Sequence, residues 1–478
     1  MRRRVESEAG FSVVLAVASI LALLLLGLAL VTVVTEDSDL SVSHVRSDQA
    51  YYAAQAGIEY AVRKLASDPS WAGLPRPGKT VGMGSFWVAR PDTVDEKGAR
   101  LSSGQMRIVA TGVVGSSTRA IQVHVASGGI ATAAGTGARG NAGDGGDATA
   151  ATIAAPEGAA VSPNGDLYVC DPPSHVVRRI SAATGTIATV AGSGLAGYSG
   201  DGGAATFARL RAPEDMAVAS NGDLYIADTG NHVIRKVTAA TGVIRTVAGT
   251  GVPGFSGDGG PAIVARLRSP RGIQVAPNGD LYVGDRGNDR IRRVVAASGT
   301  IETYAGSGAP GYSGDGGAAI AARLRAPQGL CLSSTGDLYV ADAGNNAVRR
   351  ISPAGVITTV AGTGIAGYAG DGSLAAAARL NGPRAVERAP SGDLYVADTG
   401  NDVVRRVEAG SLRISTIAGN GTAGFGGDGG SATAASLHSP RGIAVAPSGA
   451  YYVSDAGNQR IRRVAGCLAV TAWIEARR

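Results

Sequence analysis

One cassette repeats six times along most of this chain, and its regular spacing constrains the fold more than any other feature. Each copy carries two short markers: a Gly-Asp-Gly loop and, after it with the same step, Gly-Asp-Leu-Tyr, which is altered to Gly-Ala-Tyr-Tyr around Ala450 in the last copy. Two markers in phase indicate one repeated structural unit. The first marker, Gly-Asp-Gly-Gly or Gly-Asp-Gly-Ser, has its aspartate at Asp144, Asp201, Asp258, Asp315, Asp371 and Asp428, with gaps of 57, 57, 57, 56 and 57 residues.

Each cassette contains four short apolar runs separated by turn residues, as at 272–277, 280–285, 290–295 and 300–306 of the third copy. This pattern predicts a four-stranded blade, and stacked blades bury one another's faces most completely in a closed ring. We therefore predict a mainly β protein with a six-bladed β-propeller over residues 129–464. The sixth copy stops at Val464 without a fourth strand. The run Ile130–Ala134 matches that missing strand and is predicted to close the ring.

The first 128 residues differ in composition from the repeats. A basic leader (1–10, with Arg2, Arg3 and Arg4) precedes an uncharged apolar run at 11–34, which is long enough to span a bilayer. The positive-inside rule predicts a single pass through the cytoplasmic membrane, with the N-terminus in the cytoplasm and the propeller outside the cell. Residues 35–128 are predicted to form a helix extension and a small β region, with strands at 85–89, 106–112 and 118–125. Residues 465–478 are predicted to be a C-terminal tail.

Two family resemblances extend this organisation. At 224–236, the segment LYIADTGNHVIRK resembles the NHL repeat, which implies a propeller but no single function, because such propellers include binding proteins, sensors and lyases. The Gly10-Phe11 junction and the segment AYYAAQAGIEYA resemble a type IV pilin or pseudopilin, which implies cleavage after Gly10 and pilus or pseudopilus subunits as partners. Pilins usually carry a glutamate where this chain has Leu15, which indicates a minor subunit; an uncleaved signal anchor is the alternative.

Candidate binding residues follow the proline before each first strand, at positions that surround the channel mouth of a propeller. The charges there vary between blades, and a concave charged mouth is a candidate recognition surface for an unidentified protein or glycan; unrelated loop charges are the alternative. The candidates are Glu157, Glu214, Arg271, Arg384 and Arg441, with Gln328 in the fourth blade and Arg268 and Arg325 nearby.

A formal net charge of +6 does not indicate a nucleic-acid partner. Much of the excess comes from arginine pairs such as Arg349/Arg350, which recur once per blade and so do not form one basic stripe. We expect these side chains to cover apolar surface and extend their heads into water. Aromatic residues in the Gly-Asp-Gly-Gly loops, such as Tyr198, are expected to pack each loop onto its blade, with stacking on sugars as the alternative.

The sequence contains no nucleophile–base pair, and we predict an interaction or adhesion module without catalytic residues or cofactor. The alternative is a metal-dependent lyase or hydrolase outside the cytoplasm, similar to lyases of this family that use a histidine-centred site. Its divalent metal would be held by His175, His232 and His438. Against it, the blades without His175 or His232 have Asp, Asn or Gln at the same turn position, which are ordinary turn residues.

Overall fold

The computed structural model describes residues 49–58, 60–61, 73–81, 84–89, 105–114, 117–126, 129–465 and 469–476. They fall into two compact units, Ile130–Ala465 and a second that combines Met1–Gly129 with Gly466–Arg478. The leader at 1–10, the Gly10–Phe11 junction and the transmembrane helix predicted at 11–34 lie outside the described residues. Within the described residues, no helix has both the length and the apolarity needed to cross a membrane.

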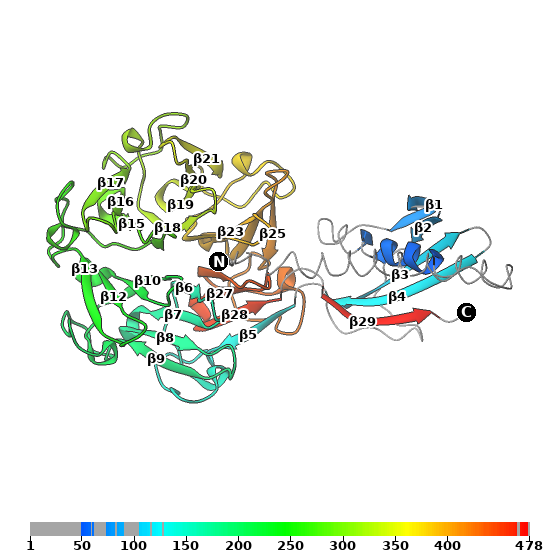
Figure 1. The fold of residues 1–478 in the computed structure, drawn as a ribbon, viewed down its shortest axis with the longest axis horizontal. Helices are drawn as coiled ribbons and strands as arrows, with labels where there is room; N and C mark the ends of the chain where they lie inside the picture. The colour runs from blue at the N-terminus through cyan, green and yellow to red at the C-terminus, as the bar shows by residue number, and fades with distance from the viewer. Residues whose placement is uncertain are drawn as a thin grey trace, which may run out of the picture. The chain divides into compact units, whose positions relative to one another are not determined.

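The larger unit is a β-propeller of six four-stranded antiparallel blades (Figure 1). Blade one contains β6 (Ala159–Val161), β7 (Leu167–Asp171), β8 (Val176–Ile180) and β9 (Ile187–Ala191). Blade two contains β10 (Pro213–Val218), β11 (Leu224–Asp228), β12 (Val233–Val237) and β13 (Ile244–Ala248). Blade three contains β14 (Ile273–Val275), β15 (Leu281–Asp285), β16 (Arg290–Val294) and β17 (Ile301–Ala305).

Blades four to six repeat this order. Blade four contains β18 (Pro327–Leu332), β19 (Leu338–Asp342), β20 (Ala347–Ile351) and β21 (Ile357–Ala361). Blade five contains β22 (Ala385–Arg388), β23 (Leu394–Asp398), β24 (Val403–Val407) and β25 (Ile414–Ala418). Blade six contains β26 (Pro440–Val445), β27 (Tyr451–Asp455), β28 (Arg460–Val464) and, from the start of the propeller, β5 (Ile130–Ala134).

Short 3-10 helices occupy two positions in each cassette. One follows every second strand: η2 (Pro172–Ser174), η4 (Thr229–Asn231), η6 (Arg286–Asn288), η8 (Ala343–Asn345), η10 (Thr399–Asn401) and η12 (Ala456–Asn458). The other follows every Gly-Asp-Gly loop: η1 (Ala148–Ala150), η3 (Ala205–Phe207), η5 (Ala262–Val264), η7 (Ala319–Ala321), η9 (Ala375–Ala377) and η11 (Ala432–Ala434).

The predicted ring closure is confirmed. Strand β5 pairs antiparallel with β28, with Ile130 opposite Val464, and so supplies the fourth strand of blade six. The Gly-Asp-Gly loop of blade six reinforces this pairing, because Asp428 accepts hydrogen bonds from the Thr132 backbone N–H (3.1 Å) and hydroxyl (2.6 Å). Strand β5 thus joins the two ends of the repeat region by hydrogen bonds as well as by side-chain packing.

The cores of the propeller lie between blades. One cluster combines Ala227 and Ile234 of blade two with Ile273, Val283 and Ile301 of blade three, all buried. The second strands are mostly apolar because both of their faces pack against neighbouring blades. A blade therefore cannot complete its core alone, as the repeat pattern predicted.

The first arginine of each pair corrects our prediction of water-exposed heads. Arg349 has 0% of its side chain exposed, whereas its neighbour Arg350 has 43% exposed. Arg349 donates to Asp315 of the Gly-Asp-Gly loop (2.6 Å) and to Asp342 at the end of β19 (3.4 Å). The prediction fails because a strand places consecutive side chains on opposite faces, and only the second arginine faces outward. The equivalent buried arginines are Arg178, Arg235, Arg292, Arg405 and Arg462.

The smaller unit contains helical residues at 49–58 and 60–61 and an antiparallel sheet in the order β1-β2-β3-β4-β29. Its strands are β1 (Leu74–Val81), β2 (Gly84–Val88), β3 (Gln105–Val114), β4 (Ser117–Ala126) and β29 (Ala469–Ala476). Ala54 and Ile58 of the helix form a buried cluster with Phe86 and Ala110 of the sheet. Gly112 permits this close packing, because a Cβ there would collide with the helix backbone at Ala50 and Ala54.

The segment predicted as a C-terminal tail contains a strand. Residues Ala469–Ala476 form β29, which pairs antiparallel with β4, with Ala469 opposite Ala126. This pairing could not be predicted from the local sequence, because the partner strand ends more than 300 residues earlier. The propeller is therefore inserted between two neighbouring strands of the smaller unit's sheet.

Candidate functional site

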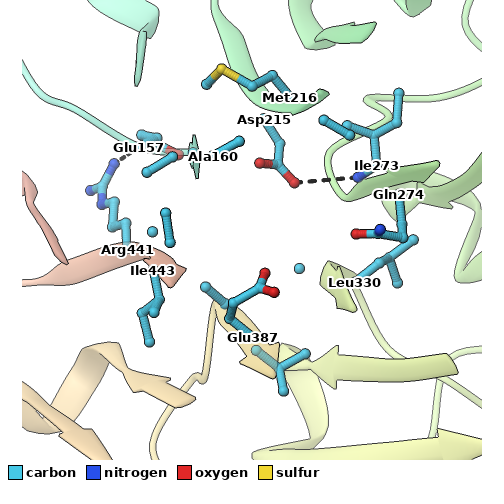
Figure 2. Close-up of a pocket in the computed structure, with 18 of the residues that line it drawn as sticks. Glu157, Ala160, Asp215, Met216, Ile273, Gln274, Leu330, Glu387, Arg441 and Ile443 are labelled. Atoms are coloured by element: carbon cyan, nitrogen blue, oxygen red, sulfur yellow. Dashed lines mark hydrogen bonds and ion pairs between the residues drawn. The ribbon is translucent and has the colours of Figure 1, made fainter. Parts of the chain in front are cut away.

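The predicted mouth residues come together at the axis of the propeller. The first strands of neighbouring blades contact one another around the ring, with β26 beside β6. These strands line a cavity of about 170 Å³, and the residues after the prolines contribute Glu157, Glu214, Arg271, Arg384 and Arg441 to its wall. Figure 2 shows a close-up of this cavity, with Glu157 and Arg441 among its labelled lining residues. Gln328, the sixth residue of the set, is buried, and its Oε1 has no hydrogen-bond partner in the part of the chain that the structure describes.

Most of the predicted charges pair across the mouth. Arg271 of blade three forms ion pairs with Glu157 of blade one and with Glu214 of blade two, the latter at 2.8 Å. Arg441 of blade six also pairs with Glu157. The side chains of Arg271 and Glu157 are less than a tenth exposed. These pairs link four blades, so Arg271 is chiefly a structural residue of the mouth and not a free ligand-binding group.

Arg384 takes part in none of these ion pairs. Among the described residues, its guanidinium forms no ion pair or hydrogen bond, although it lines the same cavity. Burial and the positive charges of Arg271 and Arg441 lower the pKa of Arg384 to about 10. Arg384 therefore remains charged at neutral pH and half-buried, and Glu157 and Glu214 attract it without forming an ion pair with it.

Two carboxyl groups deeper in the cavity are the residues that sequence reasoning missed. Asp215 accepts a hydrogen bond from the Ile273 backbone N–H (3.3 Å), and Glu387 lies 3.7 Å from the sulfur of Cys331. Figure 2 shows both carboxyl groups pointing into the middle of the cavity from opposite walls. Desolvation raises the pKa of each to about 7, since protein surrounds them although the cavity leaves part of each surface open. They are the most strongly perturbed acids of the mouth region.

A break in the repeat could have identified these two acids. Asp215 directly follows the mouth residue of blade two, where the other blades have Gly158, Gly272, Gly329, Ala385 and Gly442. Small residues are needed there, because a Cβ at Gly442 would collide with the Glu157 backbone and a Cβ at Gly329 with that of Ala385. Glu387 likewise stands where blades one, two and six have alanine. A comparison of channel positions between the cassettes would have found both.

Arg268 and Arg325 do not line the cavity. Both are exposed residues in the loops that precede the first strands of blades three and four. Their backbone N–H groups donate to Asp285 and Asp342, each at 2.8 Å, so their main chain holds the loop against the blade. Any contribution of their side chains to binding would come from outside the channel.

The three histidines are not gathered into one site. His175 and His232 have left-handed backbone conformations, and their Nδ1 atoms accept hydrogen bonds from Ala212 N (3.2 Å) and Ser269 N (3.1 Å) of the next blade. Asp289, Asn346 and Asp402 accept the equivalent bond elsewhere in the ring. In the described part of the chain, no group of three or more His, Cys, Asp or Glu residues is arranged to hold a metal ion. His175 and His232 thus act as links between blades.

The loop aromatics pack onto their own blades, as expected. The Tyr198 hydroxyl bonds to the Thr246 hydroxyl (2.8 Å), and its ring lies 5.2 Å from the guanidinium of buried Arg235. Tyr312 and Tyr368 repeat this arrangement in later blades. These rings cover the buried arginines and remain partly exposed at the rim.

Comparison with known families and proteins supports the repeat and the fold. The NHL repeat family matches residues 210–236, 267–293 and 437–464, and the teneurin NHL domain matches 307–367. Among relatives, Protein SUPPRESSOR OF QUENCHING 1, chloroplastic, of Arabidopsis thaliana is 29% identical over 53% of this chain and 25% of its own length. Mouse teneurin-1 is 33% identical over 50% of this chain and 10% of its own length. Human NHL repeat-containing protein 2 is 27% identical over 56% of this chain and 40% of its own length. The similarity thus spans well under half of each relative.

Solved structures agree on the fold alone. A Bacteroides thetaiotaomicron protein of unknown function superposes with a TM-score of 0.54 at 17% identity, covering 82% of this chain and 98% of its own. An auxiliary nutrient binding protein from Bacteroides ovatus gives a TM-score of 0.52 at 16% identity, covering 83% and 99%. The chain therefore contains NHL repeats folded into a β-propeller.

Proposed function

We propose that the propeller is an interaction module whose channel mouth captures an anionic group of a protein or glycan partner. The observation that carries this proposal is Arg384, a cation that lines the mouth cavity while Arg271 and Arg441 are engaged by acids. A half-buried guanidinium binds carboxylates and sulfates more strongly than an exposed one, because solvent screens it less. The similarity to teneurins and to NHL repeat-containing protein 2 is consistent with a protein-interaction module.

We also propose that the N-terminal segment is a pilin-like anchor that displays this module outside the cytoplasmic membrane. The support is the uncharged run at 11–34, the basic residues before it and the Gly10–Phe11 junction. Mass spectrometry of the protein from a native membrane or surface fraction tests this proposal. A mature chain that begins at Phe11 would support pilin-type processing, whereas a retained leader would leave a plain signal anchor.

The metal-dependent lyase or hydrolase stays an untested prediction, and the positions of His175, His232 and His438 give it no added support. Thermal-shift measurements with divalent metal ions would test it directly. A stabilisation that is lost when His232 is replaced would revive the alternative.

The test of the mouth site compares two arginine variants on arrays of acidic glycans and acidic peptides. Arg384→Gln is expected to lose at least about tenfold in affinity for whatever the wild-type protein captures, since a hydrogen bond to a charged group contributes about 1.5–3 kcal/mol. Arg325→Gln is the matched control, because Arg325 is exposed and lies outside the cavity. Equal capture by the two variants would refute the role of the mouth.

The structure changes the expectation for a third variant. Neutralising Arg271 alone would leave Glu157 and Glu214 without one of their counterions inside the mouth. Arg271→Gln is therefore expected to lower stability as well as binding, and only Arg384→Gln separates the two effects.

A further inference from the structure

The cavity has an asymmetric lining because the blades differ at one channel position. Three residues after the mouth position, blades six, one and two have Ala444, Ala160 and Ala217. Blades three and five have Gln274 and Glu387 at the same position, and all five of these residues line the cavity. The small side chains on one arc leave space that the polar side chains on the other arc face. A repeat with identical copies would have had a symmetric channel.

The polar arc presents acceptors to this space. Gln274 donates through Nε2 to the Val275 carbonyl (3.2 Å), which leaves its Oε1 as the free end of the amide. Figure 2 shows the Gln274 amide and the carboxyl groups of Asp215 and Glu387 directed toward the same central region. Among the described residues, neither carboxyl forms an ion pair with Lys or Arg. An enclosed acid without a cation is costly to retain unless a ligand compensates it.

The two charged parts of the cavity have opposite signs. The mouth holds the unpaired guanidinium of Arg384, and the interior holds Asp215 and Glu387. Arg384 directly precedes β22 and Glu387 lies on it three residues later, which places their Cα atoms roughly 10 Å apart along the extended chain. A ligand that satisfies both parts must carry an anionic group and a cationic group on a short skeleton.

We propose that the channel cavity binds a small zwitterion of the amino-acid class, with its ammonium group at Asp215 and Glu387 and its acid group at Arg384. An ammonium group has three N–H donors, which match the three acceptors at Asp215, Glu387 and Gln274. The volume of about 170 Å³ suits one small molecule, since an engineered cavity of about 150 Å³ holds benzene. The acid half of this site rests on the proposed function of Arg384, whereas the ammonium half does not.

The experiment titrates the full-length protein in detergent with glycine, β-alanine and 4-aminobutyrate, which differ in the distance between amine and carboxylate. Methylammonium and acetate serve as probes of each half, and binding is followed by calorimetry and ligand-observed NMR. At least one amino acid is expected to bind, more tightly than methylammonium or acetate. Glu387→Gln is expected to weaken that binding at least about tenfold, whereas Glu302→Gln, which neutralises an exposed carboxylate on β17, leaves it unchanged.

A second variant tests the cavity without removing a charged side chain, in case Glu387→Gln fails to fold. Ala160→Val fills part of the cavity without changing a charge and is expected to weaken amino-acid binding while leaving the circular dichroism spectrum unchanged. Absence of binding by all three amino acids would overturn the proposal, and if acetate still bound in an Arg384-dependent way, the proposed function would stand. Amino-acid binding that Glu387→Gln abolishes and Arg384→Gln does not affect would uphold the ammonium site and refute Arg384 as the anion site.

Discussion

The substitution Arg349→Met tests whether the six buried arginines hold the propeller together. Arg349 on β20 joins the Gly-Asp-Gly loop to the end of β19, because it donates to Asp315 and the Ser313 carbonyl of the loop and to Asp342 of β19. Methionine has a similar length but cannot donate a hydrogen bond. The variant therefore removes the charge while keeping much of the apolar packing.

The magnitude follows from the burial of the two aspartates. Asp342 is fully buried and would keep only the Asn345 amide and the Arg325 N–H as donors, each at 2.8 Å. Removing one member of a buried ion pair costs about 3–5 kcal/mol. Asp315 is 48% exposed, so water can replace its lost partner at little cost. We expect Arg349→Met to lower the free energy of unfolding by about 3–5 kcal/mol.

The matched control is the next residue on the same strand. Arg350 pairs with Asp337 at 2.9 Å with 43% of its side chain exposed, and exposed pairs contribute about 0–1 kcal/mol. Equilibrium urea unfolding of Arg349→Met and Arg350→Met at one pH measures the difference. Adding Asp342→Asn to Arg349→Met should recover part of the loss, since it removes the unpaired charge. Equal losses for the two single variants would refute the reasoning.

Three further predictions concern closure, the channel and the blade links. Thr132→Pro removes the N–H that bonds to Asp428 and should speed limited proteolysis of blade six relative to Thr132→Ser, which keeps both bonds. Burial raises the pKa of Glu387 from 4.5 to about 7, so the ligand-free wild type should lose up to about 3 kcal/mol of unfolding free energy as the pH rises from 4.5 to 7. A pH series of unfolding curves for Glu387→Gln should lack that loss. His232→Asn should cost less than about 1 kcal/mol, because asparagine makes the equivalent link in blade four, whereas His232→Leu leaves Ser269 N without its acceptor and should cost about 1–3 kcal/mol in thermal unfolding.

The parts of the fold that were predictable depend on repetition. Each apolar run recurs at a fixed step, so strand positions, blade number and the closing role of Ile130–Ala134 followed from spacing alone. The candidate mouth was also predictable in outline, because the residue after each proline enters the same end of the channel. Glu157 and Arg271 do meet there.

Pairing between distant residues was not predictable. Spacing places Glu157, Arg271 and Arg384 at one mouth, but only the three-dimensional arrangement shows that the first two neutralise each other and the third does not. The burial of Arg349 depends on the loop that folds over it, which composition cannot reveal. Strand β29 has no repeat to mark it, and its partner β4 lies on the other side of the whole propeller in sequence.

The insertion of the propeller between two strands of the smaller unit affects how a pulling force from a captured partner would act on the ring. The chain enters the ring on β5 and leaves on β28, and these strands pair with Ile130 opposite Val464. On the other side, β4 and β29 pair with Ala126 opposite Ala469. The connection from β4 to β5 and the connection from β28 to β29 therefore join one pair of hydrogen-bonded strands to another. A propeller fused at one end would transmit a pull through β5 alone and strip the closing strand from β28. In this topology β5 and β28 would share a pull on the ring, which would leave the pairing between them intact.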